Sequence, residues 1–171
     1  IKTNPTNGSV SLSPQGGFTY TPTAGFHGTD SFTYQASDGK ALSSPATVTI
    51  TVNGTPTAAA DSYTVAKGGV LNVTAPGVLG NDGDPEANAL TAIKASDPSH
   101  GTLTLDASGS FLYSPTAGYA GTDSFTYRAS DGTTQSSPQT VTIVVDAPPV
   151  ATDDAYGVTA GTTANVTAAQ G

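Results

Sequence analysis

The sequence repeats itself, and the repeat constrains the fold more than any other feature. Residues 25–34 (GFHGTDSFTY) return as residues 118–127 (GYAGTDSFTY), which sets the offset at 118 − 25 = 93 residues. At that offset residues 1–78 align with residues 94–171 without a gap, and about half of the pairs are identical. A unit of this length is too long for a solenoid repeat and is typical of a domain in a tandem array.

The repeat divides the 171 residues unevenly. We expect one complete unit over residues 56–149, a partial unit with strands C to G over residues 1–55, and the opening strands A and B of a third unit over residues 150–171. Two explanations of this frame stay open. Either the opening strands of one chain complete the partial unit of the next by strand complementation, or the sequence is a window of one continuous array. Because the chain starts with Ile, we expect it to be processed or excerpted.

Strand signals fill the complete unit. Apolar and polar residues alternate in segments rich in Thr, Val, Ile, Tyr and Phe, and Gly, Pro and Asp mark the turns between them. The pattern predicts seven strands, at residues 62–66, 70–74, 90–95, 102–106, 110–114, 124–129 and 139–145. Such a series indicates an all-β fold of tandem immunoglobulin-like (cadherin-like) β-sandwiches, with a β-barrel as the alternative. The inward positions predict an aromatic core at Phe18/Phe111, Tyr20/Tyr113, Phe32/Phe125 and Tyr34/Tyr127.

Composition excludes several classes of protein. No stretch approaches the ~20 continuous apolar residues of a membrane span, and the absence of Cys excludes disulfides, thiol nucleophiles and thiolate metal sites. Five Lys and Arg against 13 Asp and Glu give a net charge of −8, which repels nucleic acid and anionic lipid. We therefore expect no nucleic acid partner and no membrane insertion.

The sequence contains little evidence for a catalytic site. His27 aligns with Ala120 and His100 aligns with Asn7, so neither histidine recurs in the other repeat. No Gly-x-Ser-x-Gly elbow, His-Glu-x-x-His segment or phosphate-binding loop occurs. Residue counts leave a carboxylate pair for glycoside hydrolysis open, but nothing places two acids across a concave site. We expect no enzyme and name no catalytic residue.

One loop carries oxygen ligands in the pattern of a calcium site. Such side chains alternate along residues 81–88 (NDGDPEAN), at Asp82, Asp84, Glu86 and Asn88. The first ligands of an EF-hand loop alternate in the same way, but here the Gly and the closing Glu of that loop are missing. If this loop binds Ca²⁺, the other ligands come from other segments.

The topology of a sandwich brings such segments together. Alternating strand directions place the start of the first strand, the acidic loop and the turn after the sixth strand at one end, with the candidate ligands Asp61, Asn81, Asp82, Asp84, Glu86 and Asp131. In an array this end faces Asp30 and Asn53 of the preceding unit. The equivalent positions of other units, Asp123 and Asp154, complete the candidate set. Two carboxylates ~4 Å apart repel by about 4 kcal/mol at an effective dielectric of 20, and a divalent cation removes that repulsion. The sequence therefore predicts Ca²⁺ between neighbouring units.

Simpler explanations stay open for these positions. The acidic loop over residues 81–88 is also compatible with a solvated turn that binds no metal. Asp131, like Asp38, stands in a Ser-Asp-Gly sequence that is typical of a hairpin turn. Asp30 and Asp123 are equally compatible with capping the backbone N–H groups of a corner.

Several segments resemble a known family. Residues 77–84 (GVLGNDGD), followed by Leu90-Thr91, are similar to the opening signature of bacterial cadherin-like and Ig-like tandem repeats. Residues 109–115 (GSFLYSP) and 121–132 (GTDSFTYRASDG) are similar to the second half of that signature. The resemblance covers the whole chain.

The resemblance implies a β-sandwich with Ca²⁺ between repeats and a metal role for Asn81, Asp82 and Asp84. Such repeats occur in very large secreted bacterial surface proteins, including calcium-dependent adhesins of the type I-secreted kind. One linker reads AAD at residues 59–61 and the next reads TDD at residues 152–154, so the two junctions are expected to bind unequally.

Two functions from different classes follow. The first is a structural repeat of a secreted or cell-surface adhesin stalk or filament, stiffened by Ca²⁺, whose partners are neighbouring repeats of the same or an identical chain. The second is a binding module whose loop end contacts an extracellular glycan or protein.

Overall fold

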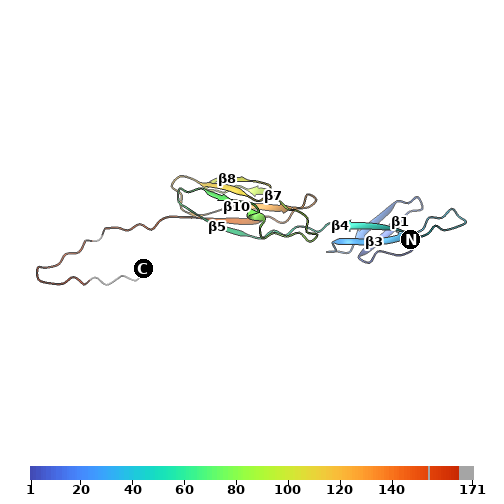
Figure 1. Cartoon of the computed structure of the whole chain (residues 1–171), viewed down its shortest axis with the longest axis horizontal. Helices are drawn as coiled ribbons and strands as arrows, with labels where there is room; N and C mark the ends of the chain where they lie inside the picture. The colour runs from blue at the N-terminus through green and yellow to red at the C-terminus, as the bar shows by residue number, and fades with distance from the viewer. Residues whose placement is uncertain (154, 166–171) are drawn as a thin grey trace.

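The chain is built of β-strands. The structure is a computed structural model that describes residues 1–153 and 155–165, and in this part it contains eleven strands and one short 3-10 helix. In chain order these are β1 (Gly8–Leu12), β2 (Phe18–Pro22), β3 (Gly28–Tyr34), β4 (Ala46–Val52), β5 (Asp61–Ala66), β6 (Leu71–Val73), η1 (Gly77–Leu79), β7 (Thr91–Ser96), β8 (Gly101–Leu105), β9 (Phe111–Pro115), β10 (Gly121–Ser130) and β11 (Gln139–Asp146). Figure 1 shows β1–β4, then β5–β11, then a tail, arranged end to end. In the part of the chain that is described, no helix has the length and apolar character needed to cross a membrane.

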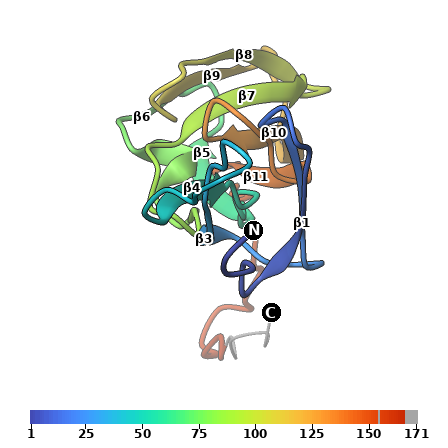
Figure 2. The ribbon, with the colours of Figure 1, turned by 90° about the vertical axis from the view of Figure 1, so that its right-hand side faces the viewer.

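Strands β5–β11 form two sheets that face each other. One sheet has the order β5-β11-β10-β7 and the other has the order β6-β9-β8. Neighbouring strands are antiparallel except for β5, which runs parallel to β11. In Figure 2 the sheet with β8 and β9 lies over the sheet with β10 and β11. This two-layer order confirms the predicted immunoglobulin-like sandwich and does not fit the alternative of a barrel.

The observed strands agree with the predicted ones to within three residues at each end. The largest difference is at β10, which begins at Gly121 rather than at residue 124. Its ladder with β11 continues back to the pair Gly121–Val145. Asp123 therefore lies inside a strand and not in a corner before it.

Aromatic side chains at inward positions form the core of the sandwich. Phe111, Tyr113, Phe125 and Tyr127 are each at most 3% exposed. The rings of Phe111 and Phe125 meet edge to face, with centroids 5.5 Å apart. Val78 of η1 is fully buried in the same cluster. Because burial of one such side chain contributes roughly 1.5–3 kcal/mol, this cluster is a main source of the stability of the sandwich.

Strands β1–β4 repeat the second half of the sandwich with the same register. They begin 93 residues before β8, β9, β10 and β11 respectively. The pair Phe32–Val48 recurs as Phe125–Val141. The four strands form two hairpins, β1 with β2 and β3 with β4. The unit boundaries expected after residues 55 and 149 stay predictions.

One part of the predicted aromatic core is wrong. Phe18 of β2 is 47% exposed, whereas its equivalent Phe111 is 3% exposed. Phe32 does reach the buried state, at 1% exposure, and Phe18 packs against its edge with centroids 5.3 Å apart. The difference arises because no strands equivalent to β5 and β6 cover β2 and β4 among the described residues.

Beyond β11 the chain continues as a tail. Its described residues, 147–153 and 155–165, form no strand and are exposed, and they include Val150, Tyr156 and Val158. The opening strands expected for a third unit fall partly on residues 154 and 166–171, which lie outside the described residues.

Candidate metal centre at the repeat junction

The junction between β4 and β5 is short and closely packed. Gly54 and Pro56 of the linker are buried. Thr57 and Gly83, in the loop after η1, exchange backbone N–H···O bonds of 2.8 and 2.9 Å. The Gly54 carbonyl accepts a bond from the hydroxyl of Thr134, in the turn after β10, at 3.2 Å. Three segments that are distant in the sequence thus converge at one end of the sandwich.

Asp61 and Asp82 form an acidic pair at this end. Asp61 begins β5, Asp82 follows η1, and both residues are half-buried. The hydroxyl oxygen of Tyr127 lies 2.9 Å from Asp82 Oδ1 and 2.7 Å from the Val78 carbonyl oxygen. The Ala59 carbonyl oxygen lies 3.1 Å from the same hydroxyl. One phenolic proton thus faces three acceptors, and Asp61 Oδ2 is buried with no hydrogen-bond partner. Acceptor oxygens outnumber donors around this pair.

Burial and repulsion disfavour the charged forms of the pair. Burial, and then the charge of Asp82, raises the pKa of Asp61 to about 6. Burial also raises the pKa of Asp82, against the opposing effect of its bonds to Ala59 and Tyr127. Because the folded-state pKa of Asp61 lies above its usual 3.8, the stability that its protonation contributes is present below pH 3.8 and is lost as the pH rises through about 6. At neutral pH the two carboxylates are therefore held in an electrostatically unfavourable state.

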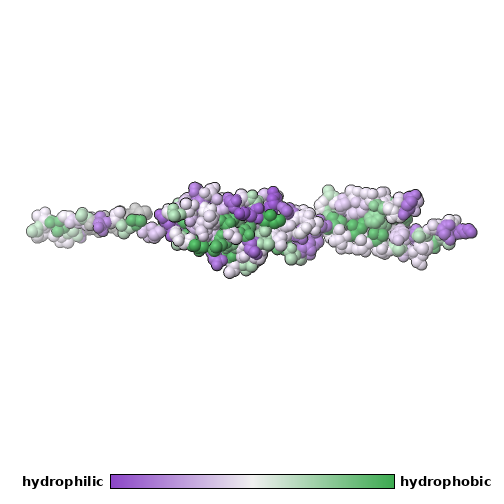
Figure 3. Space-filling view, turned by 90° about the horizontal axis from the view of Figure 1, so that it is seen from above, coloured by the Kyte–Doolittle hydropathy of each residue, from purple (hydrophilic) through white to green (hydrophobic). Residues whose placement is uncertain are grey.

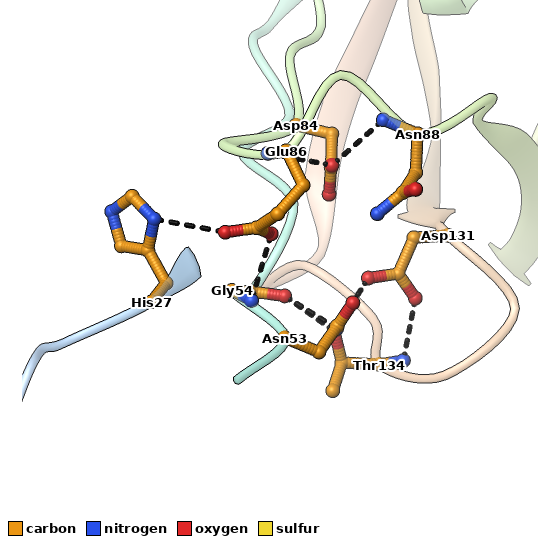
Figure 4. Close-up of polar contacts among 8 residues, drawn as sticks. All are labelled: His27, Asn53, Gly54, Asp84, Glu86, Asn88, Asp131 and Thr134. Carbon is orange, nitrogen blue, oxygen red and sulfur yellow. Dashed lines mark hydrogen bonds and ion pairs between the residues drawn. The ribbon is translucent and has the colours of Figure 1, made fainter. Parts of the chain in front are cut away.

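A second acidic group lies where the loop meets the linker. Asp84 Oδ1 accepts the N–H groups of Glu86 and Asn88, at 3.0 and 2.9 Å. Asp84 Oδ2 is buried with no partner. In Figure 4 the side chains of Asp84 and Asn88 point toward the turn that carries Asp131, whereas the Asp131 carboxylate points away from them, toward Asn53 and Thr134. Carboxylate and amide oxygens are ligand types that Ca²⁺ takes in proteins.

Two contacts join the repeats beside this loop. Glu86 Oε1 lies 2.9 Å from Nδ1 of His27, just before β3, and Glu86 Oε2 accepts the N–H of Gly54 at 2.8 Å. Asn53, after β4, donates its side-chain amide to Asp131 Oδ2 at 2.7 Å, as Figure 4 shows. Each contact pairs an acidic residue of the complete sandwich with a residue on the β1–β4 side.

Asp131 also closes its own turn. Its Oδ1 accepts the backbone N–H groups of Thr133 and Thr134, both at 2.7 Å. The bond from Thr134, and then the bond from Asn53, hold the pKa of Asp131 well below its usual value. Asp131 thus acts as a turn residue, and it turns its second oxygen toward the first repeat.

Asp30 and Asp123 stand apart from the junction cluster. Asp123 is 4% exposed and accepts four hydrogen bonds of 2.7–2.9 Å, from Ser99, His100, Ser124 and Tyr113. Burial opposes ionisation of Asp123, but these bonds outweigh it and lower its pKa. Asp30 accepts the same types of bond from Thr6, Asn7, Ser31 and Tyr20. Both carboxylates cap backbone N–H groups, and a metal role for either stays a prediction.

The structure brings five of the sequence-predicted residues to the junction, namely Asp61, Asp82, Asp84, Glu86 and Asp131. Asn81 is exposed beside them and donates its amide to the Ala60 carbonyl at 3.2 Å. Asp154 lies outside the described residues. Within the described ranges no three His, Asp or Glu side chains converge as a complete metal-ligand group. A cation here therefore needs amide, carbonyl or water oxygens as well.

Sequence reasoning missed two residues that organise the junction. The alternation predicts Tyr127 only as a core aromatic, and no sequence signal reveals that its hydroxyl lies among the loop oxygens. His27 is set aside because it does not recur, yet it contacts Glu86. A residue specific to one repeat is a signal for a junction between particular neighbours.

Comparison with known proteins agrees with this architecture. Residues 53–147 match the bacterial cadherin-like domain and residues 1–51 match the bacterial Ig domain. A search of curated proteins found no match. Among solved structures, the endo-fucoidan hydrolases MfFcnA4 and MfFcnA9 of glycoside hydrolase family 107 are 24% and 25% identical, each with a TM-score of 0.35. Each alignment covers 85% of this chain, but it covers only 24% of MfFcnA4 and 27% of MfFcnA9. This chain therefore spans about a quarter of the length of those proteins. A structural similarity at this TM-score carries no argument about function.

Proposed function

The chain belongs to the family of bacterial cadherin-like domains, and from this premise we propose that it is a repeat of an extracellular adhesin stalk or surface filament, stiffened by Ca²⁺ where repeats meet. Bacterial cadherin-like and Ig domains are extracellular structural or adhesion modules and are typically not enzymes. The neighbouring repeat is the main partner of the loop end of each sandwich.

One observation carries the calcium part of the proposal: buried acceptor oxygens at the junction lack donors. The Oδ2 atoms of Asp61 and Asp84 are both buried and without a hydrogen-bond partner. A buried acceptor left without a donor costs about 1–3 kcal/mol, and more when it is charged. A divalent cation satisfies such an oxygen and neutralises the neighbouring carboxylates at the same time.

Two groups of residues are assigned to the cation. The first is the Asp61–Asp82 pair with nearby backbone carbonyl groups, and the second is Asp84 with the amide oxygen of Asn88. Ca²⁺ takes about six to eight oxygens at roughly 2.3–2.6 Å, so water or carbonyl oxygens complete either set. A cation in the second group also fixes the loop that carries Glu86, which contacts Gly54 and His27 of the first repeat.

Stiffening follows from where the cation binds. Without it, the side-chain contacts between the repeats are polar, and the contact of the exposed His27 with Glu86 contributes about 0–1 kcal/mol. Extracellular calcium modules bind at roughly 10⁻⁴–10⁻³ M, so millimolar Ca²⁺ is sufficient to hold the repeats in one orientation. The array also grows head to tail by strand complementation, with the edge of β4 that has no partner among the described residues as the acceptor.

The calcium part is tested by thermal unfolding of the chain in CaCl₂ and in EDTA. We expect Ca²⁺ to raise the melting temperature of the wild type, and Asp84→Asn to lose most of that increase. Asp97→Asn is the matched control, because it removes the same charge at an exposed site paired with Lys94. Equal melting temperatures of the wild type in CaCl₂ and EDTA contradict the proposal. Saturable binding of a defined glycan or protein, unaffected by Ca²⁺, would instead support the binding-module alternative.

A further inference from the structure

The linker between the two repeats contains an Asn-Gly sequence, at Asn53 and Gly54. Such a pair is chemically labile in an open chain, because Gly has no Cβ to hinder attack by its backbone nitrogen on the preceding side chain. The sequence has one other such pair, at Asn7 and Gly8. The linker therefore carries a potential site of covalent modification.

Contacts across the junction require both residues of the linker pair. A Cβ on Gly54 would lie 2.8 Å from Cγ of Pro85 and 2.9 Å from Oε2 of Glu86, so a larger residue displaces the loop. The side-chain amide nitrogen of Asn53 lies 2.7 Å from Asp131 Oδ2, and a carboxylate has no N–H to donate there. The labile pair is thus a consequence of how the two repeats meet.

The same contacts hold the reacting atoms in place. Gly54 is buried, and its N–H donates to Glu86 Oε2 at 2.8 Å. The amide nitrogen of Asn53, shown in Figure 4, also lies 2.7 Å from the Gly54 carbonyl oxygen and 3.3 Å from Thr134 Oγ1. Attack requires the Gly54 nitrogen to give up its proton and the Asn53 side chain to turn toward it. Because these bonds must break first, the closed junction slows the reaction.

The junction can open without unfolding either repeat. Figure 3 shows the two parts joined by a narrow neck with a neutral to hydrophilic surface. Among the described residues, the buried apolar cluster includes none of residues 53–57. Segments with few buried apolar contacts open locally at a lower free energy than the core. Opening therefore exposes the linker pair to water while both parts stay folded.

We propose that Asn53 is a modification site that the closed junction protects and that reacts when the repeats come apart. In the open junction the Gly54 backbone nitrogen attacks Cγ of Asn53, so that a C–N bond forms and the bond from Cγ to Nδ2 breaks. The proton of the Gly54 N–H leaves with the side-chain nitrogen as ammonia. Water then opens the cyclic imide to aspartate or isoaspartate. The net change is hydrolysis of one amide, with no oxidation or reduction.

The product opposes the contact that the amide made. A carboxylate at residue 53 faces the Asp131 carboxylate, so two anions replace a donor and an acceptor. Isoaspartate also adds a methylene group to the backbone of the linker. Both products disfavour closure, and each opening that leads to reaction therefore becomes permanent.

Peptide mass spectrometry of the full chain, incubated at neutral pH in EDTA, measures the rate of deamidation at Asn53. When opening is fast relative to reaction, this rate follows the population of the open form. We expect the wild type to react more slowly than a synthetic peptide of residues 50–57. We expect Glu86→Ala to speed the reaction in the full chain about tenfold or more, the factor that corresponds to loss of a hydrogen bond to a charged group.

Two controls separate opening of the junction from other effects. Asn7 is measured in the same sample, and its rate should be equal in the wild type and in Glu86→Ala, because Gly8 lies in β1. Asp97→Asn removes a negative charge at an exposed site paired with Lys94, and it should leave the rate at Asn53 unchanged.

Asn53→Asp tests the consequence of the reaction. We expect this variant to increase the relative motion of the two parts, measured by NMR relaxation in EDTA. Asn72→Asp is the matched control, because it makes the same change at an exposed position of β6 and should leave that motion unchanged.

Three results overturn the inference. If Asn53 reacts as fast in the wild type as in the peptide or in Glu86→Ala, the junction does not protect it. If Glu86→Ala speeds Asn53 and Asn7 equally, the cause is unfolding. If Asn53→Asp moves like the wild type, the product does not keep the junction open. Because every sample contains EDTA, this inference and the calcium site can fail separately.

Discussion

Strands β1–β4 and β8–β11 have related sequences, equal spacing and equal register, yet their inward faces differ in burial. Phe18 is 47% exposed and Phe111 is 3% exposed at the same position of the two copies. Among the described residues, strands equivalent to β5–β7 and a segment equivalent to η1 pack only against the second copy. The comparison teaches that the pattern of a strand decides which face turns inward, whereas the opposing segment decides whether that face is buried.

A pair of turn glycines gives the largest expected contrast between the two copies. Gly109 and Gly16 have φ values of +85° and +89°, but a Cβ on Gly109 would lie 2.0 Å from the Pro76 carbonyl oxygen, whereas a Cβ on Gly16 meets nothing within 4 Å. We expect Gly109→Ala to destabilise the sandwich by about 4 kcal/mol or more. Gly16→Ala carries only the backbone cost of a positive φ, about 1–2 kcal/mol. Urea unfolding followed by NMR signals of each part measures both, and equal losses would contradict the close approach to Pro76.

The second-largest difference in stability is expected from truncating Phe111 and Phe18, which occupy equivalent positions of the two copies. Phe111→Ala removes a buried ring from the core and should cost about 3–5 kcal/mol. Phe18→Ala should cost about 1 kcal/mol in the isolated chain, because its ring already meets solvent. The same urea unfolding measures both variants. Equal losses in the two variants would contradict the difference in burial between Phe18 and Phe111.

Substitution of the two capping aspartates, Asp30 and Asp123, should lower stability equally in the two copies, in contrast to the glycine and phenylalanine pairs. Asp123 and Asp30 are 4% and 6% exposed and each accepts three backbone N–H bonds and one tyrosine bond. Substitution by Asn at Asp30 should lower the free energy of unfolding of the β1–β4 part by about 2–3 kcal/mol at pH 7, and substitution at Asp123 should do the same for the sandwich. The folded-state pKa of Asp123 is lowered, so its contribution is present above pH 3.8 and is lost as the pH falls through the folded-state value. The difference in melting temperature between the wild type and Asp123→Asn should therefore shrink as the pH falls below 3.8, and a constant difference would contradict the capping.

His27→Ala has the smallest expected effect on stability. His27 is exposed, so loss of its contact with Glu86 should lower the free energy of unfolding by less than about 1 kcal/mol. Its effect should appear instead in the relative motion of the two parts, measured by NMR relaxation in EDTA. Lys40→Ala is the control, since it removes an exposed side chain away from the junction. Equal relaxation in both variants would show that the contact does not restrain the junction.

The sequence alone predicts the strands and the acidic end of the sandwich, because the period of two and the offset of 93 residues depend on local spacing. It does not predict the exposure of Phe18, which depends on strands that pack from elsewhere. It also does not decide between capping and metal binding for Asp123, because the N–H groups that Asp123 caps come in part from the turn between β7 and β8. The role of Tyr127 depends on the position of its hydroxyl group among the oxygens of the loop after η1. The spacing of residues along the sequence does not predict that position.

The central claim is that Ca²⁺ fixes the orientation of the two repeats, and a distance across the junction tests it most directly. Thr19 and Thr104 are exposed, one in each part, and the chain has no other thiol when both are changed to Cys for spin labelling. Pulsed electron paramagnetic resonance then reports the distribution of distances between the labels. We predict one narrow distribution in millimolar CaCl₂ and a broad one in EDTA, with Asp84→Asn broad in both and Asp97→Asn like the wild type. Distributions of the same width in CaCl₂ and EDTA would contradict the account.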